Sequence, residues 1–278
     1  MTLLLPGSAE LLAARAGELP QKDQLCGAFW GLLALRAAPA GGGPDRDEVA
    51  LAGAGRLEQD AVALAAGTAL GTSPEARVLP PGEPGRDDFR VELPVAGVGE
   101  PGGTSATGVA RAVAELSGGA LTVVPASGDW SGARLRALLE RLAALEAPLT
   151  CIANLRTGAL WGTHPAPAEL LAYLETGDAA AGPPAEWDVG HFVALLGLVA
   201  GRRGALVAVA DSYRSLGHDG VHLQPAERVA EALGARGLLV AVERSARAAA
   251  EQAVAAAELR CEPWDNGSPD ARLSPPSP

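Results

Sequence analysis

The hydrophobic positions in the first third of the chain repeat at helical spacing. Residues 8–18 predict a short helix, and the apolar run over residues 26–37 predicts a second helix that ends in a loop rich in Gly and Pro. A third helical pattern covers residues 45–70 and has an acidic first turn. We therefore expect residues 1–75 to be mainly helical.

The middle of the chain mixes strand and helix periods. The pattern predicts strands at residues 89–95, 121–125, 149–154 and 157–162, and helices at residues 108–116, 133–145 and 168–173. The strand, helix and strand between residues 121 and 154 have the spacing of a parallel crossover. This part of the chain therefore has an α/β character.

Two strongly apolar runs on either side of residues 201–204 predict a β-hairpin. A strand at residues 237–242 is a candidate to pair with this hairpin. A turn at 215–220 and helices at 224–233 and 245–259 complete the pattern. The tail from residue 262 has low apolar content and many prolines, so we expect it to be disordered.

Composition excludes several classes of protein. Of 278 residues, 48% are hydrophobic and 20% charged, which gives ample material for a core. The net charge of −11 argues against nonspecific nucleic-acid binding and against an anionic membrane surface as partner. No apolar run approaches the ~20 residues that span a bilayer, and the N-terminus lacks the features of a signal peptide.

The three cysteines are odd in number and widely spaced, unlike a disulfide framework. They have no metal-ligand spacing with the four histidines. We therefore expect a protein of the cytoplasm that needs no metal or other cofactor.

The first candidate for chemistry is Cys26, which follows the polar turn Gln21-Lys22-Asp23-Gln24 and opens an apolar helix. A cysteine at a helix N-terminus is favoured as the thiolate, which is the nucleophile. A glutamine a few residues upstream can donate its amide N–H to the oxyanion that forms when a carbonyl is attacked. Gln21 is our preferred donor because it lies a full loop away from the sulfur, and Gln24 is the alternative.

A base and its orienting carboxylate are candidates in the hairpin. His191 opens the first strand and Asp211 follows the second. Because the start of one antiparallel strand lies beside the end of the next, we expect the two side chains to meet. Asp188 is a competitor for Asp211, although it lies on the same strand as the histidine.

The order of these residues resembles the papain-like cysteine hydrolases. Gln21, then Cys26-Gly27 opening a helix, then Gly190-His191-Phe192-Val193 opening a strand, then Asp211 after the next strand, looks closest to the bacterial double-glycine leader peptidases that process bacteriocins. The resemblance implies Cys26 as nucleophile, His191 as base, Asp211 as its orienting residue and Gln21 as oxyanion donor. The interval between Cys26 and His191 is much longer than in those compact peptidases.

The resemblance also implies the organisation of the chain. We expect an α+β, papain-like fold in which the cysteine helix packs on an antiparallel sheet that carries the histidine and the aspartate. One domain over residues 1–260 would then comprise a helical part with the nucleophile (1–75), an inserted α/β segment (86–176) and the sheet (186–244). A disordered tail (262–278) would follow.

Other chemistry-bearing residues are expected to be structural. This group comprises His164, His218 and His222 as loop residues, Cys151 and Cys261 as unreactive thiols, and Asp129-Trp130-Ser131 as a helix cap with a buried indole. Trp187 is a candidate to shield the site. The glycine-rich residues 97–103 lack the spacing of a nucleotide-binding loop.

These observations predict a cysteine hydrolase or acyltransferase that acts on a peptide or a small substrate with an amide bond through a covalent thioester. The alternative is a papain-like binding or scaffold protein that does no chemistry. Reactivity of Cys26 distinguishes the two.

Overall fold

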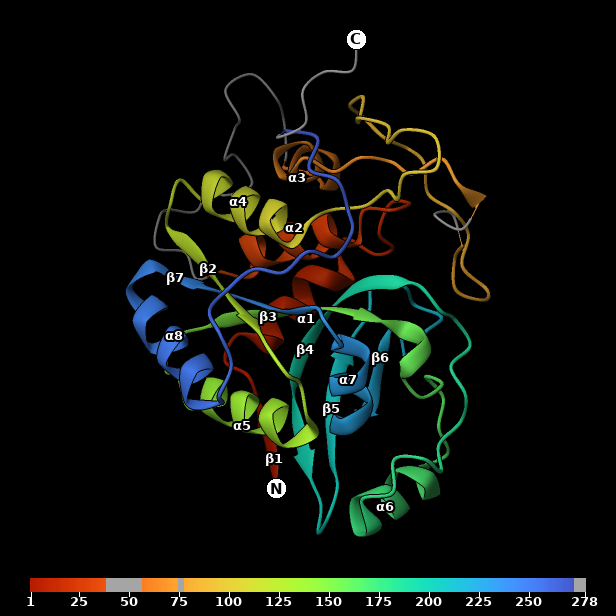
Figure 1. Cartoon of the computed structure of the whole chain (residues 1–278), viewed down its shortest axis with the longest axis vertical. Helices are drawn as coiled ribbons and strands as arrows, with labels where there is room; N and C mark the ends of the chain where they lie inside the picture. The colour runs from red at the N-terminus through yellow and green to blue at the C-terminus, as the bar shows by residue number, and fades with distance from the viewer. Residues whose placement is uncertain (39–56, 75–77, 273–278) are drawn as a thin grey trace.

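The computed structural model describes residues 1–38, 57–74 and 78–272 (Figure 1). Within these residues, the chain forms one antiparallel sheet of seven strands. The strands are β1 (Thr2–Leu4), β2 (Leu121–Ser127), β3 (Leu149–Arg156), β4 (Gly190–Ala200), β5 (Ala205–Ala210), β6 (Val221–Pro225) and β7 (Gly237–Glu243). Their order is β2-β7-β3-β4-β5-β6, and β1 pairs with the far half of β4.

Helices cover both faces of this sheet. They are α1 (Ser8–Ala16), α2 (Cys26–Ala37), α3 (Gln59–Ala66), α4 (Ala106–Leu116), α5 (Gly132–Ala143), α6 (Pro167–Thr176), α7 (Ala226–Leu233) and α8 (Arg247–Ala256). Helices α5, α7 and α8 pack together on one face, and α1 to α4 lie on the other (Figure 1). None of the helices in the described ranges is long and apolar enough to cross a membrane.

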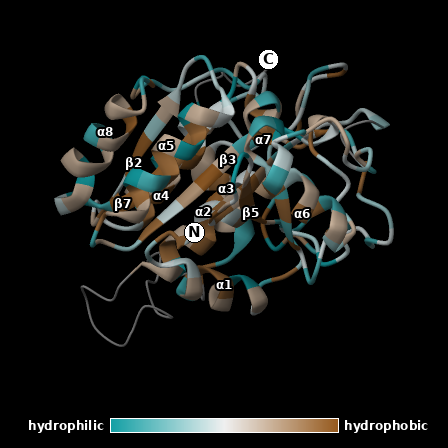
Figure 2. Ribbon diagram, turned by 90° about the horizontal axis from the view of Figure 1, so that it is seen from below, coloured by the Kyte–Doolittle hydropathy of each residue, from teal (hydrophilic) through white to brown (hydrophobic). Residues whose placement is uncertain are grey.

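Each face of the sheet has its own apolar core. On one side, the leucines of α5 recur at helical spacing and pack against β3, β4 and β7. On the other side, the aromatic residues Phe29 and Trp30 of α2 pack against Ile152 and Phe192. Because both faces are covered, the central strands β3 and β4 are mostly apolar. Brown predominates along the labelled strand β3 in Figure 2.

Several expectations from the sequence are confirmed. Helix α2 covers the range predicted for the cysteine helix, and α4, α5 and α6 lie where the middle of the chain was predicted to be helical. The hairpin is formed by β4 and β5, joined at residues 201–204. The mixed α/β class and the antiparallel sheet with His191 and Asp211 at strand ends are also observed.

The predicted parallel crossover is only half right. Strands β2 and β3 run in the same direction because each is antiparallel to β7, but β7 lies between them. Strand β7 therefore pairs with β2 and β3, and the expected pairing with the hairpin is wrong. An apolar run buried on both faces carries no information about which neighbour it will pair with. As a consequence, segment 86–176 supplies two strands of the main sheet.

Two predicted strands are not formed. Residues 89–95 are irregular apart from an isolated bridge between Val95 and Leu70, because the Arg90 N–H is bonded to the Asp60 carboxylate and Pro94 has no N–H to donate. Residues 157–162 begin with a short 3₁₀ turn and do not continue as a strand. Residues 45–56 of the helix predicted at 45–70 lie outside the described residues, and the described part, residues 57–70, contains α3.

The helix expected at residues 224–233 starts later than predicted. Residues 221–225 form the edge strand β6, and α7 begins only after Pro225. Strand β1 at the N-terminus was not predicted either, because three residues are too few for a period to show.

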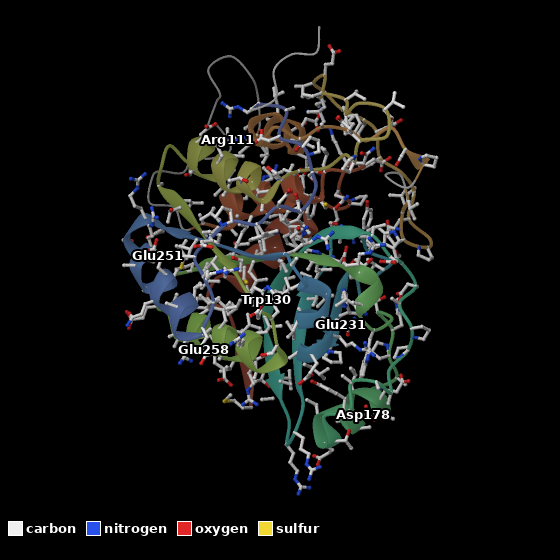
Figure 3. The ribbon with its side chains drawn as sticks, in the orientation of Figure 1. Arg111, Trp130, Asp178, Glu231, Glu251 and Glu258 are labelled. Atoms are coloured by element: carbon white, nitrogen blue, oxygen red, sulfur yellow. The ribbon has the colours of Figure 1, made fainter. Side chains whose placement is uncertain are left out.

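The expected disorder of the tail is wrong for residues 262–272. Trp264 is buried, and its indole Nε1 donates to Asn154 Oδ1 at 3.2 Å. Asp270 forms an ion pair with Arg111 of α4, with an N–O distance of 2.7 Å; Arg111 is labelled at the top of Figure 3. A few specific contacts thus order a segment whose average composition is typical of disorder. Residues 273–278 of the predicted tail lie outside the described residues.

Candidate active site

Cys26 is the first residue of α2 and lies at the edge of a cleft. Two contacts fix the start of this helix. A Cβ on Gly27 would lie 2.9 Å from Thr104 Cβ, so only glycine allows this close approach. Trp30 Nε1 donates to the Phe192 carbonyl oxygen at 2.9 Å, which joins the helix to the strand that carries His191.

His191 and Asp211 form a buried pair next to Cys26. His191 Nε2 lies 3.1 Å from Asp211 Oδ1, and each of the two side chains is only 3% exposed. The side chain of His191 is also hydrogen-bonded to Cys26. The pair forms because β4 and β5 are antiparallel, with Ala194 opposite Ala210, so the start of β4 lies beside the end of β5.

Asp211 is held in place by its own backbone surroundings. Its Oδ1 accepts a hydrogen bond from the Ser212 N–H at 2.7 Å, and its carbonyl oxygen accepts one from Arg15 Nε at 2.5 Å. Charged hydrogen bonds to a carboxylate favour the ionised form. The orientation of the carboxylate toward the imidazole is therefore fixed before any ligand binds.

The electrostatics of the pair favour an imidazolium and a carboxylate. Burial by itself would lower the pKa of His191, but the Asp211 charge and the hydrogen bonds with Asp211 and Cys26 outweigh burial and raise this pKa to about 10. Burial would likewise raise the pKa of Asp211, and the attraction of His191 outweighs it, so the pKa of Asp211 is lowered. The proton therefore resides on His191 at neutral pH.

Gln21 lies inside this cluster, whereas Gln24 is occupied elsewhere. The Gln21 Oε1 atom accepts a hydrogen bond from Ser212 Oγ at 2.6 Å, and its side chain is also hydrogen-bonded to Tyr213. Gln24 forms two hydrogen bonds with the backbone of Gly71, as donor at 3.2 Å and as acceptor at 2.6 Å. Of the two glutamines, Gln21 is therefore the one that lies beside His191 and Asp211.

Asp188 does not face the histidine. It forms a bidentate ion pair with Arg156, with N–O distances of 2.6 and 3.0 Å, and its side chain is exposed. Arg156 is the main cause of the lowered pKa of Asp188. Asp188, the alternative to Asp211 as the orienting residue, is therefore paired with Arg156 at the surface.

The structure brings three further residues to the site. Trp187 lies with its ring centroid 4.9 Å from that of His191, as expected for a shielding residue. Tyr213 and Ser212 were not singled out from the sequence, although they directly follow Asp211. Burial, the first cause, raises the pKa of Tyr213, so its phenol stays neutral. Their position directly after Asp211, the candidate orienting residue, is the sequence signal by which Ser212 and Tyr213 could have been identified.

The cleft beside Cys26 has a volume of about 500 Å³. One wall comes from residues 101–104 together with Asn266 and Ser268 of the C-terminal segment, and another from β3 and the start of β4. A second cavity, of about 420 Å³, contains none of the four predicted site residues. The cleft next to the cysteine is therefore the place where a substrate of this site would bind.

The remaining histidines and cysteines lie outside the cluster or behind it. His222 is buried, which corrects its expected place in a solvated loop, and burial, the first cause, lowers its pKa to about 4. His164 and His218 are exposed. Burial raises the pKa of Cys151 to about 12, and Cys261 is exposed.

At Asp129-Trp130-Ser131 the expected helix cap is confirmed, whereas the indole expected to be buried is only partly buried. Ser131 Oγ caps α5 by accepting from the Arg134 N–H at 3.2 Å, and the Trp130 indole donates to a backbone carbonyl oxygen. Across the described part of the chain, no group of three or more His, Cys, Asp or Glu side chains is arranged to hold a metal ion.

Comparison with known proteins identifies the family. The chain belongs to DUF6885, a family of unknown function, whose model matches residues 5–265 and so includes the whole cluster around Cys26. No curated protein and no solved structure matches the chain.

Proposed function

We propose that this protein is a cysteine-dependent hydrolase or acyltransferase of the papain-like kind, acting on an amide or peptide bond through Cys26, His191 and Asp211. The observation that carries the proposal is the buried imidazole–carboxylate pair, 3.1 Å apart, whose histidine also bonds to a cysteine in the cleft. A nucleophile, a base and an orienting carboxylate in hydrogen-bonded sequence are the constellation that nucleophilic catalysis requires.

In the proposed reaction, Cys26 Sγ attacks the substrate carbonyl carbon as the thiolate, with its proton held on His191. His191 then donates this proton to the leaving nitrogen as the C–N bond breaks, which leaves a thioester on Cys26. Water, or an amine in acyl transfer, attacks the thioester while His191 accepts its proton. The thiolate departs from the acyl carbon, and the cycle needs no cofactor.

The negative charge on the carbonyl oxygen needs donors in the transition state. The Cys26 N–H has no acceptor within its own helix because Cys26 is the first helical residue. The Gln21 side chain is buried, lines the same cleft as Cys26 and is anchored through its amide oxygen, so its amide nitrogen is the end that can donate. We assign the oxyanion role to these two groups.

The test is the rate at which iodoacetamide alkylates Cys26 as a function of pH. Mass spectrometry of the peptides separates Cys26 from the exposed Cys261, which serves as an internal reference thiol. The variants are His191→Ala and His191→Gln, with His164→Ala as a control in which an exposed histidine is removed. We expect rapid labelling of Cys26 below about pH 7, lost in both His191 variants and retained in the control.

Labelling that rises only near about pH 8.5, as for an ordinary thiol, and that does not depend on His191 would contradict the proposal. It would leave the alternative function of a papain-like binding or scaffold protein. If the expected labelling is found, peptides and small amides can be screened for a thioester on Cys26 by intact-mass measurement.

A further inference from the structure

Arg236 is a partly buried guanidinium in the same cleft as Cys26 and His191. It lies against the start of β4, where its Nη2 atom is 3.6 Å from the position of a Cβ on Gly190. In the described ranges, its side chain has no ion pair and no hydrogen bond, and no carboxylate contributes to its electrostatic surroundings. Its charged neighbour is another cation, Arg156.

Arg156, the other arginine in the cleft, differs from Arg236 because it has a counter-ion. Arg156 also lines the cleft, but its charge is neutralised by the bidentate ion pair with Asp188. Asp23 also lines the cleft; its carboxylate accepts a hydrogen bond from the Arg86 backbone N–H at 2.8 Å and is not among the charges that act on Arg236. Among the described residues, Arg236 thus has no carboxylate as its own counter-charge. Burial, followed by repulsion from Arg156, lowers its pKa, which is a cost that a bound anion would remove.

The backbone of Arg236 is held firmly. Its N–H donates to the Leu233 carbonyl oxygen at 2.7 Å, and its own carbonyl oxygen accepts from Trp130 Nε1 at 2.8 Å; Trp130 is labelled near the centre of Figure 3. Strand β7 begins at the next residue. A recognition residue on such a support loses little conformational entropy of the backbone when a ligand binds.

We propose that Arg236 binds a carboxylate of the substrate, so that the preferred substrates are amides or peptides with a free carboxylate near the scissile bond. The proposal rests on the function assigned to Cys26 above. The planar fork of a guanidinium matches a carboxylate in bidentate geometry, and an otherwise apolar or neutral substrate would leave its charge uncompensated.

The test uses alkylating probes that differ in one charge. N-Iodoacetyl glycine, β-alanine and γ-aminobutyric acid place a carboxylate at increasing distance from the reactive carbon, and each is compared with its own primary amide. The measured quantity is the ratio of the two labelling rates at Cys26, determined by peptide mass spectrometry. In the wild type, we expect at least one spacer to give a ratio of about ten in favour of the carboxylate.

In Arg236→Gln this ratio should fall close to one, and Arg236→Lys, which keeps the charge but loses the fork, should retain part of it. Arg202→Gln removes an equal charge from the exposed turn of the hairpin and should leave the ratio unchanged. Cys261, which has both Glu251 and Arg247 as electrostatic neighbours, should show no preference for the carboxylate probes.

A ratio near one for every spacer in the wild type, or a preference that persists in Arg236→Gln, would overturn the proposal. This failure is separate from failure of the proposed function. The ratio can be measured at high pH even if Cys26 is an ordinary thiol, whereas activation of Cys26 is judged from its dependence on His191.

Discussion

Gln21 and Ser212, 191 positions apart in the sequence, are joined by two hydrogen bonds. The backbone N–H of Gln21 donates to the Ser212 carbonyl oxygen at 3.2 Å, and Ser212 Oγ donates to the side-chain oxygen Oε1 of Gln21 at 2.6 Å. The loop before the nucleophile is thereby attached to the residue after Asp211. Because the amide oxygen accepts from Ser212, the amide nitrogen of Gln21, which carries two N–H groups, is the end that can donate to an oxyanion. The two halves of the site are thus positioned by a direct link between them.

This link predicts different effects on acylation and on alkylation. Acylation of Cys26 by p-nitrophenyl acetate passes through an oxyanion, whereas alkylation by iodoacetamide does not. We expect Gln21→Ala to slow acylation by about 100-fold and to slow alkylation much less. Ser212→Ala should slow acylation by about tenfold, since it loosens the amide without removing it.

Gln24→Ala is the matched control, because that side chain is bonded to Gly71 and does not reach the cluster. The rates are measured from the burst of p-nitrophenol and from peptide mass spectrometry. Equal effects of Gln21→Ala and Gln24→Ala on acylation would remove Gln21 from the oxyanion role.

The charge on Asp211 predicts a pH dependence. The native pKa of His191, about 10, lies above its ordinary value of 6.5, so the pair contributes stability that is fully present below about pH 6.5 and is lost as the pH rises through about 10. In Asp211→Asn, burial dominates, and the pKa of His191 should fall by more than one unit. The NMR titration of the His191 ring measures this shift.

Asp188→Asn is the control for this experiment. It removes an exposed carboxylate three residues before His191 that is paired with Arg156. We expect no change in the His191 titration in this variant. A similar shift in both variants would mean that the general field of the protein, and not the Asp211 contact, holds the proton on His191.

His222 predicts a loss of stability in acid. Its native pKa, about 4, is below the value of 6.5 in the unfolded chain, so the unfolded state binds more protons between these values. The free energy of unfolding should therefore decrease by about 2 kcal/mol between pH 7 and pH 4.5 through this residue alone. Urea unfolding of wild type and His222→Gln at both pH values measures this difference.

The variant His222→Gln should lose less stability in acid than the wild type, whereas removal of the exposed His218 should leave the pH dependence unchanged. The same decrease in wild type and His222→Gln would show that carboxylates, rather than His222, cause the acid sensitivity.

The sequence located the candidate catalytic residues where they stand at the ends of helices or strands that the local hydrophobic pattern predicts. Cys26 opens a predicted helix, and His191 and Asp211 flank a predicted hairpin, so their elements and ends could be read from apolar runs and glycines. The meeting of His191 with Asp211 followed from antiparallel geometry alone. Local patterns thus located the candidate site without any knowledge of the sheet order.

The contacts that depend on long-range packing could not be read in this way. Nothing in the pattern places β7 between β2 and β3, because all three runs are similarly apolar. Arg236 follows a helix and a turn, and its position in the cleft depends on that sheet order. Trp264 is a single aromatic residue in a polar segment, and its burial depends on contacts with Asn154 and Gly237, which are far away in the sequence.

Lys22, next to Gln21 in its loop, forms a buried ion pair with Asp60. This pair predicts that a single variant loses more stability than the double variant that removes both charges. Lys22 Nζ lies 2.8 Å from Asp60 Oδ1, and both side chains are nearly inaccessible. Lys22→Met should cost about 3–5 kcal/mol because it leaves the buried Asp60 carboxylate without a counter-ion. Lys22→Met combined with Asp60→Leu should recover most of that loss.

The free energy of unfolding of the two single variants and the double variant, measured in urea, checks this prediction. Additive losses in the double variant would mean that the two residues do not act as a pair. The exposed pair Arg247–Glu251 on α8 is a suitable control, since its removal should change stability by less than about 1 kcal/mol.

The C-terminal segment predicts a loss of both stability and cleft structure when its anchor is removed. Trp264 is buried against Gly237 and donates to Asn154, and two residues beyond it, Asn266 forms part of the cleft wall. Trp264→Ala should lower the free energy of unfolding by about 3–5 kcal/mol through lost packing. Trp264→Phe keeps most of the packing and loses the hydrogen bond, at a cost of about 1 kcal/mol.

Deletion of residues 263–278 should destabilise at least as much as Trp264→Ala, because it also removes Asp270 from Arg111. Urea unfolding measures all three variants against the wild type. If the deletion leaves the free energy of unfolding unchanged, the segment contributes nothing to the fold, and the disorder suggested by its composition would be correct. If the losses are as expected, the cleft wall depends on a segment that begins after the last helix, and the ratio of carboxylate to amide labelling at Cys26 should fall in the deletion variant.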